Sequence, residues 1–170
     1  TEVIDASGDG AGNVLAFASG LEYDSQGNLY VAGYVSNNVF KIAPDGSISL
    51  VMDMSGDGAG NMLIGPGGII SDPADNIYVN GIFSDVLFKV NPAGVISVGI
   101  DATGDGAGNT LDEPTGMAID DDGNLYLASR GTDSVFKITA GGAISVVLDA
   151  SGDGSGNVLT APAGILLDGN

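Results

Sequence analysis

The chain has 170 residues, of which 22 are acidic, four are basic and none is His, so its formal net charge is −18. This charge repels phosphate backbones and anionic membranes, and no apolar run is long enough to span a bilayer, which argues against nucleic acid partners and against membrane insertion. The absence of Cys excludes disulfides and thiolate metal sites, whereas the apolar share of 44% predicts a folded chain with a core.

One motif, D-x-[ST]-G-D-G-[AS]-G-N, occurs four times at a constant spacing of 48 residues, starting at Asp5, Asp53, Asp101 and Asp149. It divides the chain into three full repeats, residues 5–52, 53–100 and 101–148, and a partial fourth, residues 149–170. A fixed period of this size is typical of stacked or circular repeat architectures. We therefore expect residues 1–170 to form a single array rather than several unrelated domains.

Each repeat is predicted to contain four short strands, which we call a, b, c and d. In the third repeat they cover residues 116–120, 124–128, 134–139 and 144–148, all rich in β-branched and aromatic residues. The connections between a and b and between c and d are too short for a helix and contain Gly, which favours antiparallel hairpins. By alignment, residues 1–4 are a leading strand d and residues 164–168 a trailing strand a.

The segments 20–33 and 114–128, each followed by Val-Phe-Lys-Ile, resemble blades of NHL-type β-propellers and of the related SMP-30/gluconolactonase rings. The resemblance implies an all-β fold, a β-propeller segment with three full four-stranded blades between a leading strand d and a trailing strand a. Such rings include enzymes, lyases and binding modules, so the fold alone does not assign a function.

Three and a half blades would leave a wide gap if they formed a ring alone, with apolar blade faces in water. We therefore expect further blades to complete the ring. They would come from a longer parent chain, which we favour, or from further copies, while a continuous stack of blades is the alternative.

The loop between strands d and a has the residue spacing of a calcium-binding loop. Asp5, Ser7 and Asp9 stand at positions 1, 3 and 5, the Ala11 carbonyl at position 7 and Asn13 at position 9. A large hard cation requires six to eight oxygen ligands, which such spacing can supply. The loops resemble the DxDxDG sites of integrin-type propellers and dockerin-like modules. The other three loops offer Asp53, Ser55, Asp57, Ala59 and Asn61; Asp101, Thr103, Asp105, Ala107 and Asn109; and Asp149, Ser151, Asp153, Ser155 and Asn157.

At position 12, where an EF-hand has a bidentate Glu, only the third loop has a carboxylate, Asp112, whereas the others have Ala16, Ile64 and Thr160. Calcium affinity should therefore be weak or require a ligand from elsewhere. The alternative is that each loop is a glycine-rich turn, in which Asp and Asn bond their own backbone.

Alternating strand directions place the d-to-a loops and the b-to-c turns on the same rim. The most variable columns of the repeat lie there, and we predict a binding rim formed by Tyr34, Ile82, Phe83 and Arg130. The alternative is that these columns are ordinary surface positions that tolerate substitution. Three fixed columns on strands b and c are predicted to be structural, with Tyr30 and Phe40 in the core and Lys41 directed toward a carboxylate such as Asp24.

Taken together, these features predict a calcium-stabilised structural or binding propeller module without catalysis of its own. We expect an extracellular or cell-surface protein, because weak calcium loops fill at extracellular calcium concentrations. We also expect a bacterial protein whose ligand is a protein or a glycan. The alternative is part of a propeller enzyme of gluconolactonase or lyase type whose catalytic residues lie outside this segment. Glu22 is the only acid in the core of the strands a, and one carboxylate without a base or metal cluster is not a catalytic site.

Overall fold

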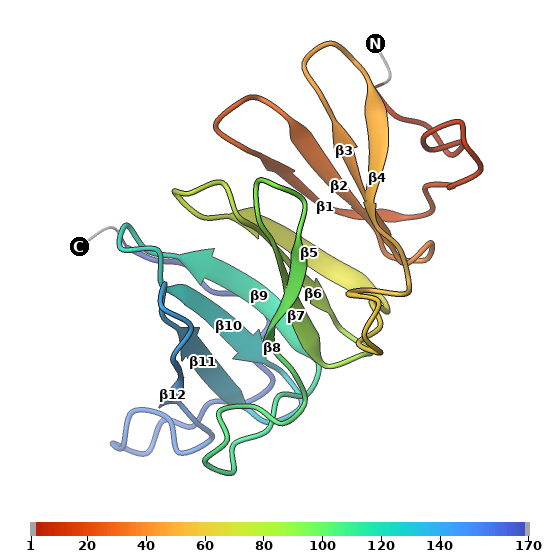
Figure 1. Cartoon of the computed structure of the whole chain (residues 1–170). Coiled ribbons are helices and arrows are strands. Elements are labelled where there is room, and N and C mark those ends of the chain that lie inside the picture. The colour runs from red at the N-terminus through yellow and green to blue at the C-terminus, as the bar shows by residue number, and fades with distance from the viewer. Residues whose placement is uncertain (1–2, 169–170) are drawn as a thin grey trace.

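The computed structural model describes residues 3–168, in which twelve strands and no helix occur. They form three antiparallel four-stranded sheets, each ordered as in the sequence (Figure 1). This confirms the predicted all-β propeller segment. The strands are β1 (Ala18–Tyr23), β2 (Leu29–Gly33), β3 (Asn38–Ile42), β4 (Ile48–Met52), β5 (Pro66–Ser71), β6 (Ile77–Gly81), β7 (Val86–Val90), β8 (Ile96–Ile100), β9 (Pro114–Ile119), β10 (Leu125–Ser129), β11 (Ser134–Ile138) and β12 (Ile144–Leu148).

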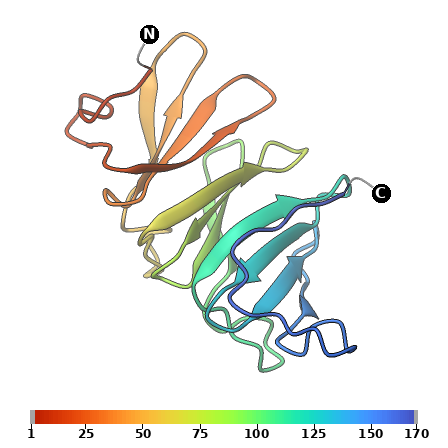
Figure 2. The ribbon, with the colours of Figure 1, turned by 180° about the vertical axis from the view of Figure 1, so that it is seen from behind.

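The three sheets are the blades of an open fan. Their first strands, β1, β5 and β9, contact one another in turn and form the inner side of the fan, as the view from behind shows (Figure 2). The short hairpins a-to-b and c-to-d lie along one rim, and the long Asp-containing loops and the b-to-c turns lie along the other (Figure 1). We call these the hairpin rim and the loop rim; their arrangement is the one that strand alternation predicts.

The core lies between successive blades. One buried cluster joins the first blade to the second and includes Met52, Leu63 and Phe88, and another joins the second to the third and includes Leu111 and Phe136. The side chains of the Phe column, at positions 40, 88 and 136, are completely buried, as the sequence predicts. Hydrophobic burial between neighbouring blades is therefore what holds each meander in place, because a single meander has two apolar faces to cover.

Glycine is required where the inner strands converge. A Cβ on Gly116 would lie 2.6 Å from the Cα atom of Gly164, and a Cβ on Gly20 would lie 3.0 Å from the backbone nitrogen of Ile69. Backbones that approach this closely leave no room for a side chain. Gly20 and Gly116 thus allow the close approach of neighbouring backbones on the inner side.

The two flanking strands differ from the sequence expectation. Within the leading segment, residues 1–2 lie outside the described residues and residues 3–4 form a bend; in the trailing segment, residues 164–168 have no strand assignment. The trailing segment nevertheless runs beside β9, where Thr115 Oγ1 donates a hydrogen bond to the Pro162 carbonyl (Figure 2). It lacks a strand b to pair with, and without a ladder of hydrogen bonds it is not a strand.

The segment is open at both ends. A third apolar cluster, which contains Leu15, Val31 and Phe40, lies in the first blade with no blade beyond it. At the other end Leu166 is 94% exposed. The incomplete propeller therefore calls for further blades at its open faces. No helix in residues 3–168 is long and apolar enough to cross a membrane.

Candidate functional site

Each Asp loop begins with a tight turn held by its first carboxylate. Asp5 Oδ1 accepts hydrogen bonds from the backbone nitrogen and the hydroxyl of Ser7. The same pair of bonds recurs in the loops that start at Asp53, Asp101 and Asp149. An Asp side chain that bonds the backbone two residues later is an Asx turn, which forms without a ligand.

A second turn follows at once. Asp9 Oδ1 accepts hydrogen bonds from the backbone nitrogens of Ala11 and Asn13, and Asp9 Oδ2 accepts one from Asn13 Nδ2 at 2.6 Å. The turn between β1 and β2, on the hairpin rim, is built in the same way from Asp24 and Asn28. The second half of each Asp loop is thus the same local motif as the hairpin turn of a blade.

These hydrogen bonds stabilise the charged form of the loop carboxylates. The Ser7 hydroxyl first, and its backbone amide second, lower the pKa of Asp5 below its ordinary value, and the Asn13 amide does the same for the pKa of Asp9. Equivalent shifts occur at Asp53, Asp57, Asp105, Asp149 and Asp153. The loops therefore keep their negative charge under mildly acidic conditions.

The donor set of each loop is suited to a hard cation, since it contains carboxylate, hydroxyl, amide and carbonyl oxygens. Asp5 Oδ2 accepts neither of the bonds that hold its turn and is free to serve as a ligand. In residues 3–168, however, no group of three or more acidic side chains gathers. The structure accordingly does not bring Asp112 together with Asp101 and Asp105, and places it against Gly131 instead.

The loop rim carries a cluster of three aromatic side chains, which we call the aromatic trio: Phe17, Tyr34 and Phe83. The ring centroids of Phe17 and Tyr34 lie 5.8 Å apart with a tilted arrangement, and those of Tyr34 and Phe83 lie 5.8 Å apart edge to face. Phe17 and Phe83 are 73% and 58% exposed. The structure thus brings together two of the four predicted rim residues and adds one from a neighbouring loop.

Sequence reasoning missed Phe17, although its column carried a signal. That column reads Phe17, Gly65, Glu113 and Ala161, as variable as the predicted rim columns, and every member has a positive φ, between 44° and 62°. A bulky residue in this region of backbone space is strained, and Gly is the natural occupant. Phe17 therefore occupies an unfavourable backbone position without burying its ring.

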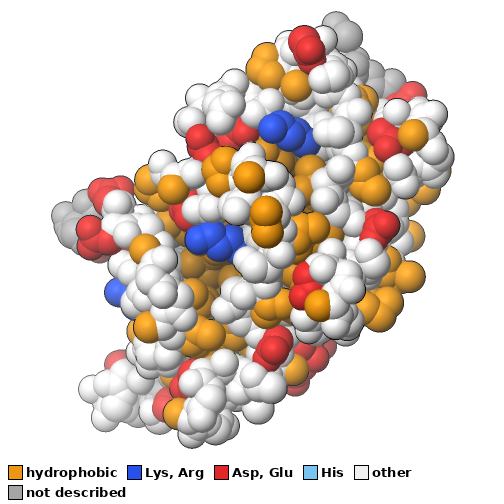
Figure 3. Space-filling view, viewed as in Figure 1, with side chains coloured by type: hydrophobic (Ala, Val, Ile, Leu, Met, Phe, Trp, Pro, Cys, Tyr) orange, Lys and Arg blue, Asp and Glu red, His pale blue; other side chains and the backbone are white. Residues whose placement is uncertain are grey.

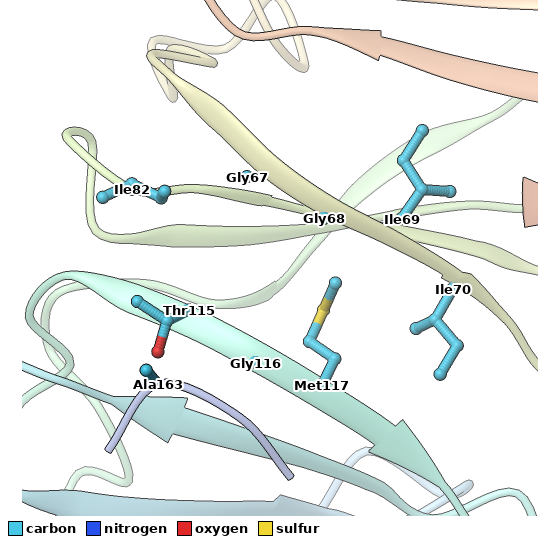
Figure 4. A pocket seen from close by; sticks show the side chains of 9 residues that line it. All are labelled: Gly67, Gly68, Ile69, Ile70, Ile82, Thr115, Gly116, Met117 and Ala163. Carbon is cyan, nitrogen blue, oxygen red and sulfur yellow. The ribbon is translucent and has the colours of Figure 1, made fainter. Parts of the chain in front are cut away.

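The other two predicted rim residues lie apart from the trio. Arg130 forms an ion pair with Glu113 at 3.5 Å, and Ile82 lines a hollow of about 330 Å³ on the inner side, between the second and third blades (Figure 4). Figure 4 shows that hollow with Met117 and Ile70 beside the backbones of β5 and β9. Thr115 supplies the only side-chain hydroxyl of its lining, and no acid or base contributes.

Polar side chains on the inner side form hydrogen bonds between neighbouring blades. Glu22 Oε1 accepts hydrogen bonds from the backbone nitrogen and hydroxyl of Ser71, at 3.1 and 2.6 Å. Asn80, which is fully buried, accepts one from the Gly68 amide and donates one to the Pro114 carbonyl. Both groups have structural partners, and neither stands beside a general base.

Lys41 lies on the hairpin rim, with its ammonium 5.7 Å from the centre of the Tyr30 ring, rather than in the expected carboxylate pair. Lys89 and Lys137 repeat this arrangement. Tyr30 and Lys41 face each other directly across β2 and β3, which places the ammonium over the ring. Burial first, and the charge of Asp24 second, raise the pKa of Tyr30 to about 12.

Comparisons with known proteins agree with this architecture. The pattern described as Beta-propeller repeat matches residues 104–137, within the third repeat. No curated protein matches the chain. Among solved structures the chain is similar to an auxiliary nutrient binding protein from Bacteroides ovatus, with a TM-score of 0.67, 15% identity, and coverage of 91% of this chain and 44% of the other.

Two enzymes are similar in the same way. A streptogramin B lyase matches with a TM-score of 0.66 and 17% identity over 88% of this chain and 44% of the lyase. A gluconolactonase from Xanthomonas campestris matches with a TM-score of 0.62 and 14% identity over 81% of this chain and 49% of the enzyme. The chain thus spans about half the length of these proteins, and at such identities the likeness is one of fold. The chain has the structure of an open propeller segment, and residues 104–137 match a β-propeller repeat.

Proposed function

We propose that this chain is a non-catalytic binding segment of a larger β-propeller, working outside a bacterial cell and stabilised by calcium in its Asp loops. The observation that carries the proposal is the aromatic trio on the rim richest in loops, in which Phe17 and Phe83 are exposed and Tyr34 is half-buried between them. Exposed aromatic groups on loops supported by a rigid sheet are typical of recognition surfaces.

The calcium part of the proposal rests on donor chemistry. In the first loop a Ca²⁺ ion would be held by Asp5, Ser7, Asp9, Asn13 and the Ala11 carbonyl, and the equivalent residues would serve in the other three. A bound divalent cation would offset the repulsion among the eight loop carboxylates and fix the linker between blades. Two carboxylates per loop predict weak binding, which is suited to extracellular calcium levels.

An enzyme of gluconolactonase or lyase type is the second candidate, and the fold likeness is what favours it. The residues of this segment give it little support. The inner hollow is lined by aliphatic side chains, backbone and one hydroxyl, and Glu22 already accepts two hydrogen bonds from Ser71. A catalytic site would need its acid and base from other blades.

The calcium proposal is tested by melting the protein with excess Ca²⁺ and with excess chelator. We expect a higher melting temperature with Ca²⁺, because a ligand that binds the folded state alone stabilises it. A variant with Asn in place of Asp5, Asp53, Asp101 and Asp149 should lose this difference.

Asp45→Asn is the matched control. Asp45 Oδ1 accepts hydrogen bonds from the backbone nitrogen and hydroxyl of Ser47, as Asp5 does from Ser7, but it lies in a hairpin without the rest of the loop motif. This variant should keep the full response to Ca²⁺. Equal melting temperatures with Ca²⁺ and with chelator would refute the calcium proposal and leave the binding rim standing.

A further inference from the structure

The aromatic trio is built from two blades. Phe17 and Tyr34 belong to the first blade and are joined by a backbone hydrogen bond from the Tyr34 nitrogen to the Phe17 carbonyl, 2.9 Å long. Phe83 comes from the second blade, and Gly65 lies so close beneath its ring that a Cβ there would be 2.6 Å from it. The blades themselves are fixed by the bond from the Gly65 amide to Asn37 Oδ1. The three rings therefore rest on a rigid frame.

Backbone strain at Phe17 indicates that the ring is kept for something other than stability. Its φ of 58° disfavours a bulky side chain, and its 73% exposure means that it gains little from burial. The next repeat has Gly at the same position. Strain of this kind is typically retained where a side chain has a functional role.

The trio also lacks a cation of its own. The chain has four basic residues, and all are engaged elsewhere: three Lys ammonium groups lie over Tyr rings on the hairpin rim, and Arg130 pairs with Glu113. The faces of aromatic rings attract cations, and the chain uses this attraction three times in its own blades. The aromatic trio offers the same chemistry with no internal partner.

The negative charge of the chain favours cationic partners at long range. The net charge of the chain is −18, of which the eight loop Asp residues account for −8, so the chain stays strongly acidic when calcium neutralises its loops. On the face seen in Figure 3, acidic side chains are scattered and basic ones are few. Such a field attracts cationic partners and repels anionic ones. An exposed aromatic cluster on an acidic chain is complementary to a segment that presents both a cation and an aliphatic stem.

We propose that the aromatic trio binds a basic peptide segment of a partner protein, with a Lys or Arg side chain packed across Tyr34 between Phe17 and Phe83. The stem of that side chain would contact the rings, its cation would meet their faces, and the net negative charge of the chain would steer the segment toward the protein. This inference rests on the proposed binding function and names the class of partner.

The test is calorimetric titration of the protein with a short oligolysine peptide at low and at high salt. We expect binding that weakens with salt, because screening removes the steering charge. Tyr34→Ala and Phe83→Ala should each weaken the affinity by about tenfold, the loss expected when a desolvated cation loses an aromatic face. Circular dichroism should show that both variants stay folded, since Phe83 is exposed, Tyr34 is only half-buried and neither belongs to a buried core cluster.

Val95→Ala is the control, because Val95 is a 59% exposed apolar residue in a hairpin between c and d, away from the trio. Its affinity for oligolysine should equal that of the unaltered protein. Equal binding by the Tyr34 and Phe83 variants would show that net charge alone attracts the peptide, and would overturn the inference, as would no binding at all.

A neutral β-glucan oligosaccharide separates this inference from the proposed function. If the glycan binds, loses affinity in the Tyr34 and Phe83 variants, and oligolysine does not bind, the basic partner is wrong while the binding rim stands. If neither probe binds and a panel of neutral peptides also fails, both the inference and the binding function of the rim are refuted.

Discussion

The first and third blades place different chemistry on the same backbone frame. In the first, the Tyr34 nitrogen donates to the Phe17 carbonyl and the two rings contact each other at a tilt; in the third, the Arg130 nitrogen donates to the Glu113 carbonyl and the two side chains form an ion pair. The backbone bonds are nearly equal in length, 2.9 and 3.1 Å. The repeat therefore fixes the frame independently of these side chains, which leaves the two columns free to vary with function.

The core side chains of the frame are buried, whereas those of the variable columns are exposed or half-buried. The largest effect on stability is therefore expected from a substitution in the buried frame. Phe88→Ala removes a completely buried ring between the first and second blades and should lower the free energy of unfolding by about 3–5 kcal/mol. Phe83→Ala, at a 58% exposed rim position, should change it by less than about 0.5 kcal/mol. Urea unfolding measures both. Similar losses in the two variants would mean that the rim is part of the core.

A smaller effect is expected at the bonds that join one blade's turn to the next blade. Asp85 Oδ1 accepts a hydrogen bond from the Glu113 amide at 2.9 Å, and Asp85 has a φ of 49°, which Asp tolerates better than Ala. Asp85→Ala should cost about 1–2 kcal/mol and speed hydrogen exchange at the Glu113 amide. Asp45→Ala, whose bonds stay within one hairpin, should leave that exchange unchanged.

Replacing Phe17 tests the backbone strain at this position of the first blade, which the second blade avoids with Gly65. Phe17→Gly puts the residue of the second blade at this position and relieves the positive φ, so the free energy of unfolding should rise by up to about 1 kcal/mol while oligolysine affinity falls. Urea unfolding and calorimetry on the same sample measure the two changes. A variant that is both less stable and fully active in binding would show that the ring serves the fold.

The smallest effect on stability per residue is expected at the Asp loops, which recur in every repeat. Seven of the eight loop Asp residues have folded-state pKa values below the ordinary 3.8, so their contribution to stability is complete above that pH and is lost as pH falls through the lower folded values. Each contribution is small because the carboxylates are exposed. Melting temperatures between neutral pH and pH 2 should fall at the acid end, and the Asp9→Asn and Asp57→Asn double variant should fall less. If the melting temperature of this variant falls as steeply at acid pH as that of the unaltered protein, other carboxylates cause the loss of stability.

A structural feature could be predicted from the sequence when it depends on interactions between residues close together in the chain. The strands follow from local patterning: the predicted 134–139 and 144–148 agree with β11 and β12 to within one residue, because alternation, Gly turns and β-branched residues act between neighbours. The Asp loops are equally local, and their turns form from hydrogen bonds over two to four residues.

Tertiary structure decided the rest. The sequence identified Tyr34 and Phe83 as variable, but only the packing of the second blade against the first brings their rings within 5.8 Å, and Phe17 joins them from the Asp loop of the first blade. It also placed Lys41 over Tyr30, and left residues 164–168 without a strand, because a strand exists only when another pairs with it. The sequence by itself determined the repeat, its strands and its turns, since these depend on contacts within a few residues. Which side chains meet across blades was decided by long-range burial, which local patterns do not encode.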